Sequence, residues 1–284
     1  MSDFIQHVSD TSFWVAHYRA IESARPDALF NDPYAHLLVG DRADSIDKLI
    51  SQTTKWTQWT LVMRTVVIDQ MIRDLIAKGV TTFLNIGAGL DTRPYRMNLG
   101  PNIKWIEMDF DYVLDHKKSH LKNIQSTCQL ESIALDLSNR ELRQSHFTKI
   151  ATANKQIAVI TEGVLLYLTQ DQVSELSEDL LRHSSFTQWI GEYISPKSYP
   201  YLKNPKRMKT VKNSPFKFFP EDWMGFFESR GWKLAEAQYF IDISEKHKRS
   251  TPMPKFFKVL EFIKGPEWAL PFKRMSGFLM WEQS

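Results

Sequence analysis

A short stretch of this sequence combines glycines, an acid and apolar residues in a pattern that suits the binding of a nucleoside. Residues 82–93 read TFLNIGAGLDTR, in which an apolar run ends at Gly87 and Gly89, and glycines let the backbone turn close to a ligand. Asp109 ends the next apolar run, about 20 residues after Gly89, where a carboxylate can accept hydrogen bonds from both ribose hydroxyls. The pattern therefore predicts a nucleoside site at the ends of two strands.

The third glycine of the dinucleotide-binding pattern is absent, because Leu90, Asp91 and Thr92 follow Gly89. Asp91 near a helix start would accept hydrogen bonds from the amides that a pyrophosphate needs, and its charge would repel an anion. A cofactor with a ribose but no phosphate suits the site better, and S-adenosylmethionine is such a molecule. Taken alone, the glycine pair fits a structural tight turn equally well.

Further polar residues at the ends of apolar runs strengthen this prediction. Asp136 could accept the adenine amino group, while Leu137 offers its main chain and an apolar wall. Glu162 could bind the ammonium group of the cofactor. Arg64, on a helix-like stretch, could hold the cofactor carboxylate with two hydrogen bonds.

Each of these residues also has a purely structural interpretation. Asp136 could cap residues 138–140, Glu162 could pair with a lysine, and Arg64 could pair with Asp69 or another helix. The combination favours binding, because open α/β sheets bind ligands at the carboxyl ends of successive strands.

The order of the elements predicts the sheet that positions these residues. Residues 1–80 are predicted to be helical, and strands are expected at 82–87, 104–109, 129–134, 157–162, 186–193, 232–240 and 276–282. This alternation predicts an α/β fold, a doubly wound and mostly parallel seven-stranded sheet. We expect a single domain over 1–284, with a helical lid at 1–80, a cofactor-binding core at 81–194, and a substrate cap with the last strands at 195–284.

The sequence resembles the leucine carboxyl methyltransferase family, including its bacterial branch of S-adenosylmethionine-dependent methyltransferases. The motif NIGAGLDTRPYR at 85–96 carries this resemblance. Similar motifs lie at 14–23, 25–33, 63–65 with Asp69, 107–110, 136–137 and 161–168. The resemblance covers roughly residues 12–240 and weakens after about residue 195, so it does not name the acceptor.

The resemblance implies a class I methyltransferase fold, which is Rossmann-like, with the last strand antiparallel. It implies contacts of Arg64 and Gly87 with the methionine part of the cofactor, Asp109 with the ribose, Asp136 and Leu137 with the adenine, and Glu162 with the amino group. Tyr167 would face the substrate.

A basic segment follows the fifth predicted strand. No acid interrupts the run of Lys197, Lys203, Lys206, Arg207, Lys209, Lys212 and Lys217. Such a cap could attract an acidic acceptor, although a solvated basic loop is the favoured interpretation. The net charge of +3 is too small to indicate a nucleic-acid partner.

Composition narrows the remaining possibilities. No apolar run approaches the roughly 20 residues of a membrane helix, and no signal-type start is present, so we expect a soluble cytoplasmic protein without a membrane span. Cys128 is the single cysteine, which excludes an internal disulfide. No spacing suggests a metal site, and His17, His116 and His120 are expected to be surface or packing residues.

The predicted chemistry is methyl transfer to oxygen. A carboxylate acceptor needs no general base whereas a hydroxyl does, and no residue identifies itself as catalytic. We therefore expect an O-methyltransferase that prefers a carboxylate of a small molecule or of a peptide or protein C-terminus. Two alternatives stay open: an NAD-linked oxidoreductase, which the missing glycine and Asp91 disfavour, and a non-catalytic binding protein with the same fold.

Overall fold

The computed structural model describes residues 11–43, 46, 55–204 and 215–284, and they form a seven-stranded sheet in the order β3-β2-β1-β4-β5-β7-β6. The strands are β1 (Thr82–Ile86), β2 (Lys104–Asp109), β3 (Gln129–Ala134), β4 (Ile157–Thr161), β5 (Phe186–Ile194), β6 (Trp232–Tyr239) and β7 (Ser276–Gln283). Neighbouring strands from β3 to β5 are parallel, and β7 is antiparallel to both β5 and β6. The predicted doubly wound α/β sheet is therefore confirmed.

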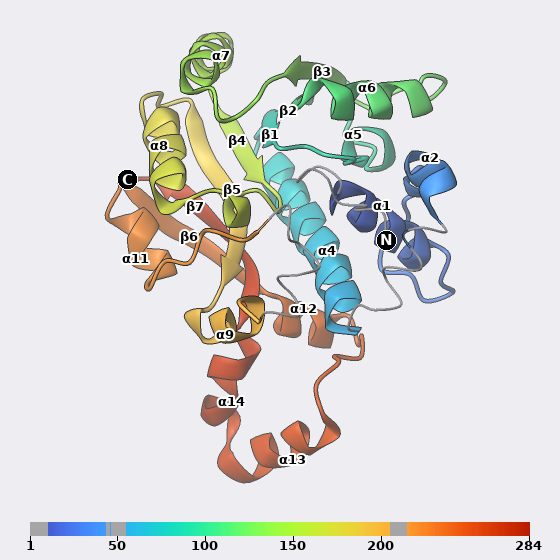
Figure 1. The fold of residues 1–284 in the computed structure, drawn as a ribbon, viewed down its shortest axis with the longest axis vertical. Helices are drawn as coiled ribbons and strands as arrows, with labels where there is room; N and C mark the ends of the chain where they lie inside the picture. The colour runs from blue at the N-terminus through green and yellow to red at the C-terminus, as the bar shows by residue number, and fades with distance from the viewer. Residues whose placement is uncertain (1–10, 44–45, 47–54, 205–214) are drawn as a thin grey trace.

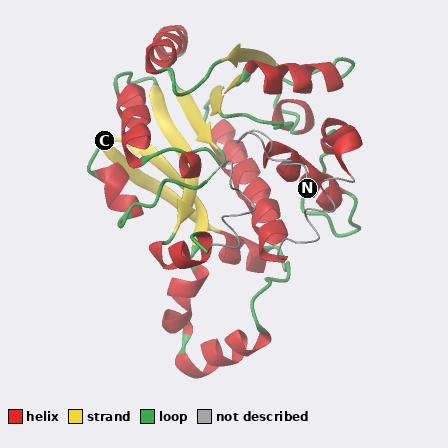
Figure 2. Cartoon of the chain, viewed as in Figure 1, coloured by secondary structure: helices red, strands yellow, loops and turns green. Residues whose placement is uncertain are grey.

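Helices cover both faces of this sheet (Figures 1 and 2). The helices that matter for the site are α4 (Lys55–Ala77), α5 (Arg93–Arg96), α6 (Asp111–His120), α7 (Arg140–Ala153), α8 (Gln170–Leu181), α11 (Trp223–Glu228) and α12 (Phe240–Lys246). Side chains alternate along each strand. Leu84 and Val159 therefore pack toward α7, α8 and α11, whereas Phe83 and Ile160 pack toward α4 and α12. Because both faces are covered, the central strands β1 and β4 are buried throughout.

The helices of the N-terminal region are α1 (Thr11–Ser23), α2 (Ala35–Val39) and the 3-10 helix η2 (Gly40–Arg42). Phe13 and Trp14 of α1 pack with Leu38, Leu90 and Val113 in a third apolar cluster. This packing fixes α1 beside the loop that follows β1. The predicted lid covers residues 1–80, of which 1–10, 44–45 and 47–54 lie outside the described residues.

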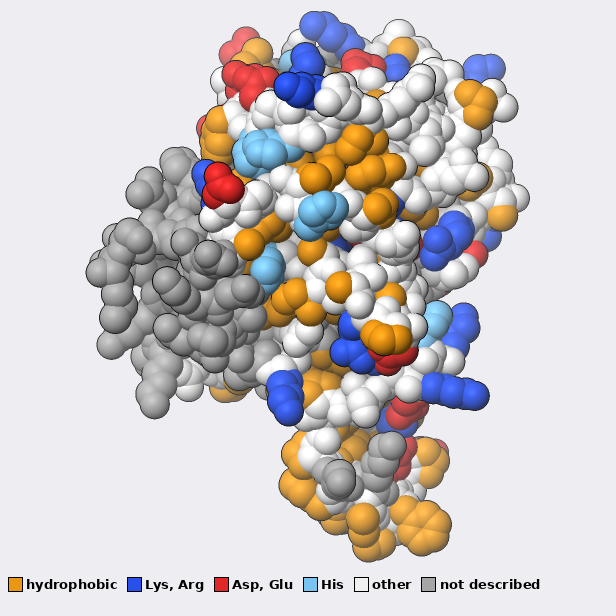
Figure 3. Space-filling view, turned by 90° about the vertical axis from the view of Figure 1, so that its right-hand side faces the viewer, with side chains coloured by type: hydrophobic (Ala, Val, Ile, Leu, Met, Phe, Trp, Pro, Cys, Tyr) orange, Lys and Arg blue, Asp and Glu red, His pale blue; other side chains and the backbone are white. Residues whose placement is uncertain are grey.

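The C-terminal part contains short helices besides β6 and β7. They are the 3-10 helix η4 (Pro196–Ser198), α9 (Tyr199–Leu202), α13 (Lys255–Lys264) and α14 (Pro266–Lys273). Helices α13 and α14 project from the body, and Figure 3 shows hydrophobic side chains gathered at this end. They include Phe262, which is 90% exposed. Of the basic segment, Lys206, Arg207, Lys209 and Lys212 lie outside the described residues.

Several expectations from composition concern single residues. Cys128 is buried, and burial raises the pKa of its thiol to about 11, as suits a packed side chain. His17 is buried, and the ring of His116 packs edge to face on Phe13. Within the described ranges, no helix is long and apolar enough to cross a membrane, and no three His, Cys, Asp or Glu residues are grouped to hold a metal.

A buried ion pair fastens α6 to the sheet. Lys117 is 2% exposed and pairs with Glu107 of β2, which is 1% exposed. The Lys117 ammonium also donates a hydrogen bond to the main-chain oxygen of Asp91, 3.2 Å away. Burial raises the pKa of Glu107, and the charge of Lys117 offsets only part of that effect. The ion pair therefore holds the Lys117 ammonium in the core, next to the loop that follows the glycine turn.

We predict that Lys117→Met lowers the free energy of unfolding by about 3 kcal/mol or more, because it leaves the buried Glu107 without its ion-pair partner. Urea denaturation measures the change. The double variant Glu107→Gln/Lys117→Met restores most of the loss, since it removes the unpaired charge. A single variant as stable as the wild type would contradict this prediction.

Candidate functional site

The eight predicted site residues line one cavity at the carboxyl ends of the parallel strands. They are Arg64, Gly87, Gly89, Asp109, Asp136, Leu137, Glu162 and Tyr167. The cavity has a volume of about 1010 Å³, at the top of the range of roughly 300–1,000 Å³ for ligand pockets. It therefore has room for a nucleoside cofactor and a second molecule.

The turn after β1 requires glycine. Gly87 has φ 67°, in the left-handed region, and a Cβ atom there would lie 2.4 Å from Cγ2 of Val164. The amide groups of Gly87 and Ala88 both donate to the main-chain oxygen of Met108, at 2.8 and 3.1 Å. The turn is thereby fixed against β2, with its backbone facing the cavity.

Asp109 is held in place by the same turn. Its carboxylate accepts hydrogen bonds from the amides of Gly89 at 2.6 Å and Phe110 at 2.7 Å. Burial raises the pKa of Asp109, and these two hydrogen bonds counteract it. Each carboxylate oxygen keeps lone pairs that are free to accept another donor. The side chain is thus oriented before any ligand arrives.

Asp136 and Leu137 follow β3. Asp136 is exposed and accepts a hydrogen bond from the amide of Ser138 at 2.9 Å, as its structural interpretation anticipated. It also lines the cavity, so the local cap and a ligand contact are compatible. The main-chain oxygen of Leu137 accepts a hydrogen bond from Arg143 of α7 at 2.5 Å.

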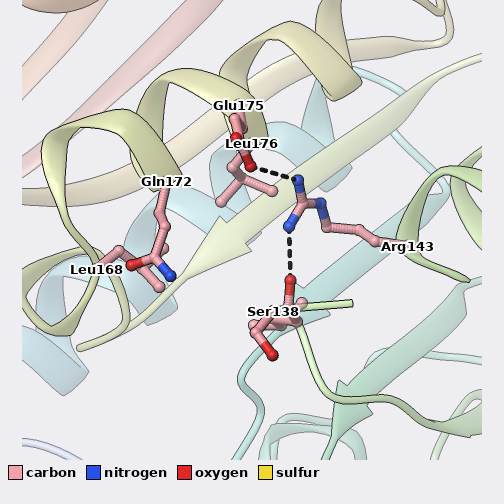
Figure 4. A pocket seen from close by; sticks show the side chains of 7 residues that line it. Ser138, Arg143, Leu168, Gln172, Glu175 and Leu176 are labelled. Carbon is pink, nitrogen blue, oxygen red and sulfur yellow. Dashed lines mark hydrogen bonds and ion pairs between the residues drawn. The ribbon is translucent and has the colours of Figure 1, made fainter. Parts of the chain in front are cut away.

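Arg143 fixes this end of the cavity from outside. Its guanidinium pairs with the buried Asp179 of α8 at 2.5 Å and with Glu175 at 3.9 Å. Figure 4 shows Arg143 facing α8 across a small pocket of about 40 Å³. That volume accommodates no more than a water molecule or two, each of which takes roughly 30 Å³ in the liquid. The contact therefore serves to hold the main chain of Leu137.

Arg64 and Glu162 lie side by side in the wall of the cavity. Their side chains form an ion pair of 2.8 Å, and Glu162 also accepts a hydrogen bond from Arg93 at 2.6 Å. Among the structural alternatives, pairing of Arg64 with Asp69 is wrong, because Asp69 binds Arg93 and Arg96 instead. Pairing of Glu162 with a lysine is wrong as well, since both of its partners are arginines.

Arg93 does not line the cavity, but it holds residues that do, and sequence reasoning missed it. It is 2% exposed and pairs with Asp69 at 2.7 Å, Asp91 at 3.0 Å and Glu162 at 2.6 Å. Burial alone would raise the pKa of Glu162, but Arg93 and Arg64 outweigh it and hold that pKa below its ordinary value. Asp91 also accepts a hydrogen bond from the amide of Arg93 at 2.9 Å, as its place near a helix start indicated. The motif at 85–96 contained this arginine, but nothing in its spacing identified the partners.

Glu192 near the end of β5 is a second missed residue. It is 6% exposed; one carboxyl oxygen accepts a hydrogen bond from the amide of Leu166 at 3.3 Å, and the other has no hydrogen-bond partner. Burial raises the pKa of Glu192 to about 7, although the nearby Arg64 lowers it. The available signal was an acid beside Gly191 at a strand end, which is the pattern of Glu162 and Gly163.

Glu192 makes stability depend on pH. Its pKa is about 7 in the folded protein against 4.5 for an ordinary glutamate, so between these values the folded chain keeps a proton that the unfolded chain has lost. The free energy of unfolding therefore falls as pH rises from 4.5 to 7, by roughly 3 kcal/mol, and stays level above 7.

We predict that Glu192→Gln removes this fall, so that its stability relative to the wild type rises between pH 5 and pH 8. Urea denaturation at each pH measures the difference. Glu228→Gln, at an exposed end of α11, serves as the control and should follow the wild-type curve. Parallel curves for Glu192→Gln and the wild type would refute the prediction.

Known proteins resemble this chain in sequence. The family model of leucine carboxyl methyltransferase matches residues 12–180. A Streptomyces coelicolor relative is 30% identical over 240 residues, which cover 79% of this chain and 83% of the relative. A Mycobacterium bovis relative is 32% identical over 284 residues, covering 89% and 91%. Both carry the name "Putative S-adenosyl-L-methionine-dependent methyltransferase".

Solved structures share the fold. A crystal structure of a "putative methyltransferase" from Thermobifida fusca has a TM-score of 0.57 and 15% identity, and the match covers 95% of this chain and 94% of that one. A DUF574 family protein from Streptomyces avermitilis has a TM-score of 0.59 and 10% identity, covering 95% and 97%. The sequence match spans most of the chain and includes the glycine turn, Asp109 and Asp136, so this chain belongs to the leucine carboxyl methyltransferase family.

Proposed function

We propose that this protein transfers the methyl group of S-adenosylmethionine to an oxygen atom of its acceptor, with a carboxylate preferred over a hydroxyl. The chain is an S-adenosylmethionine-dependent methyltransferase, as its family and its relatives are. This excludes the alternatives of an NAD-linked oxidoreductase and a non-catalytic binding protein. The main support for the proposal is that all eight predicted residues line the same cavity.

The residues of the cavity fit the parts of this cofactor. Arg64 and Glu162 offer opposite charges side by side, which suits a zwitterionic tail whose carboxylate binds Arg64 and whose ammonium binds Glu162. Asp109 would accept hydrogen bonds from the ribose, and Asp136 with Leu137 would bind the adenine. Tyr167 lines the cavity from the 3-10 helix η3 (Leu165–Tyr167) after β4, and its ring contacts Phe216 with a centroid distance of 5.4 Å. This aromatic contact supports the assignment of Tyr167 to the acceptor.

The bound cofactor supplies a methyl carbon on a positive sulfur: a lone pair of the acceptor oxygen forms the new C–O bond while the C–S electron pair passes to sulfur. The contribution of this chain is to hold the two reactants aligned, which can be worth about 7–11 kcal/mol. No histidine is among the described residues that line the cavity, and its acids Asp91, Asp109, Asp136 and Glu162 all accept hydrogen bonds. A carboxylate acceptor is already ionised and needs no general base, which supports a carboxylate over a hydroxyl.

Calorimetric titration of S-adenosylmethionine tests the cofactor site. We expect saturable binding by the wild type and at least tenfold weaker binding by Asp109→Ala, because the ribose loses its acceptor. The control is Asp111→Ala, an exposed acid two residues away, which should bind like the wild type. NAD is titrated in parallel and should not bind. Equal affinity of the Asp109 and Asp111 variants would overturn the ribose assignment.

A comparison of two ligands tests the assignment of Arg64. S-adenosylhomocysteine carries the amino-acid tail, whereas 5′-methylthioadenosine keeps the nucleoside and lacks the tail. We expect Arg64→Met to weaken binding of S-adenosylhomocysteine at least tenfold and binding of 5′-methylthioadenosine less than twofold. Arg73→Met, at an exposed position of the same helix, is the matched control. A similar loss for both ligands would show that Arg64 supports the fold rather than the tail.

A further inference from the structure

The part of the cavity beyond the strand ends differs in chemistry from the cofactor part. Its wall is rich in aromatic side chains, namely Trp56, Trp59, Tyr167, Tyr201, Phe216 and Phe272. All the acids that line the described cavity are at or just after the ends of strands β1 to β4: Asp91, Asp109, Asp136 and Glu162. The other part therefore presents apolar surface without a negative charge.

Lys197 and Lys217 line this apolar part. Main-chain hydrogen bonds at or near these residues hold the backbone from which the two side chains extend. The amide of Lys217 donates a hydrogen bond to the main-chain oxygen of Leu166 at 2.7 Å, and Leu166 directly precedes Tyr167. The segment that carries Lys197 is anchored through Ser195, whose amide donates to the main-chain oxygen of Met275 at 2.9 Å. The two ends of the basic segment thus bring two lysines to the same cavity.

No acid among the described residues neutralises these lysines. The ammonium groups of Lys197 and Lys217 have no ion-pair or hydrogen-bond partner in the described part of the chain, and both residues are exposed and line the cavity. Lys273 also lines the cavity, but it pairs with Glu245 at 3.0 Å and Glu261 at 2.9 Å. Unlike Lys273, Lys197 and Lys217 therefore carry positive charges that no described acid compensates, and they lie in a cavity with aromatic walls. A solvated basic loop does not explain why these two lysines line the cavity.

We propose that this part of the cavity binds an amphipathic organic acid, whose apolar body packs on Tyr167 and Phe216 and whose anionic group is held by Lys197 and Lys217. Binding of such an acid follows from the cavity alone. Its role as the methyl acceptor rests on the proposed function. A neutral apolar molecule would gain nothing from the lysines, and a small polar acid would leave the aromatic wall unused.

Matched acids and amides test the proposal with the full chain. The probes are benzoate, 2-naphthoate and dodecanoate, each paired with its uncharged primary amide, and affinity is measured by calorimetric titration. For at least one pair, we expect the wild type to bind the acid at least tenfold more tightly than the amide. We expect this preference to fall below threefold in Lys197→Met/Lys217→Met, and to weaken with added salt.

A second double variant controls for the change in net charge. Lys155→Met/Lys233→Met removes two exposed lysines that do not line the cavity, and it should keep the wild-type preference. The proposal is overturned if no pair shows a preference for the acid in the wild type, or if the preference survives in Lys197→Met/Lys217→Met.

Each titration is run with and without saturating S-adenosylhomocysteine, and binding of that ligand is measured in every variant. If the wild type does not bind S-adenosylhomocysteine, the proposed function fails, whereas the acid preference still decides the role of the lysines. Retained binding of S-adenosylhomocysteine by Lys197→Met/Lys217→Met shows that a lost acid preference does not come from unfolding.

Discussion

The part of the cavity at the strand ends, where we propose that the cofactor binds, depends on one buried guanidinium. Arg93 joins Asp69 on α4, Asp91 in the loop after β1, and Glu162 after β4. A buried charge is tolerated only when it is paired and hydrogen-bonded, so Arg93 needs these acids, and each acid loses a partner without it. The shared guanidinium therefore holds the helix and the two strand ends together, with Glu162 beside Arg64.

The same network reaches the N-terminal helices. Arg96 binds Asp69 at 2.6 Å and lies 3.8 Å from Asp32, which also pairs with Arg19 of α1 at 2.8 Å. The hydroxyl of Thr92 donates to Asp32 at 2.6 Å. The cavity wall contributed by α1 is thus tied to the loop that carries the glycine turn. A site whose side chains are held this way loses little conformational entropy when a ligand binds.

Sequence was sufficient to predict the sheet and to select residues that line one cavity at its strand ends. Buried parallel strands are continuous apolar runs, and a ligand site on such a sheet lies where the strands end, so Asp109 and Glu162 could be located by position alone. Their partners could not, because a partner depends on how a helix is rotated against the sheet. Asp69 accordingly binds Arg93 and Arg96 rather than Arg64, its nearer neighbour in sequence. Glu192 was missed because it lies before the end of its strand. Sequence placed both lysines in a basic segment but could not show that they line the cavity, because only the folded chain brings Lys217 beside Leu166.

The two parts of the cavity use charge in different ways. At the strand ends Asp91, Asp109 and Glu162 are largely buried and each has at least two partners, so their positions are defined and salt screens them weakly. Lys197 and Lys217 are exposed, where an ion pair at 4 Å is worth only about 1 kcal/mol in bulk water and roughly 4 kcal/mol at a protein surface. Such lysines attract an anion without fixing its geometry, which is left to the aromatic wall. In the proposed site, Glu162 would attract the ammonium of the cofactor while the lysines would attract an anion, so the opposite charges of the two parts would orient donor and acceptor toward each other.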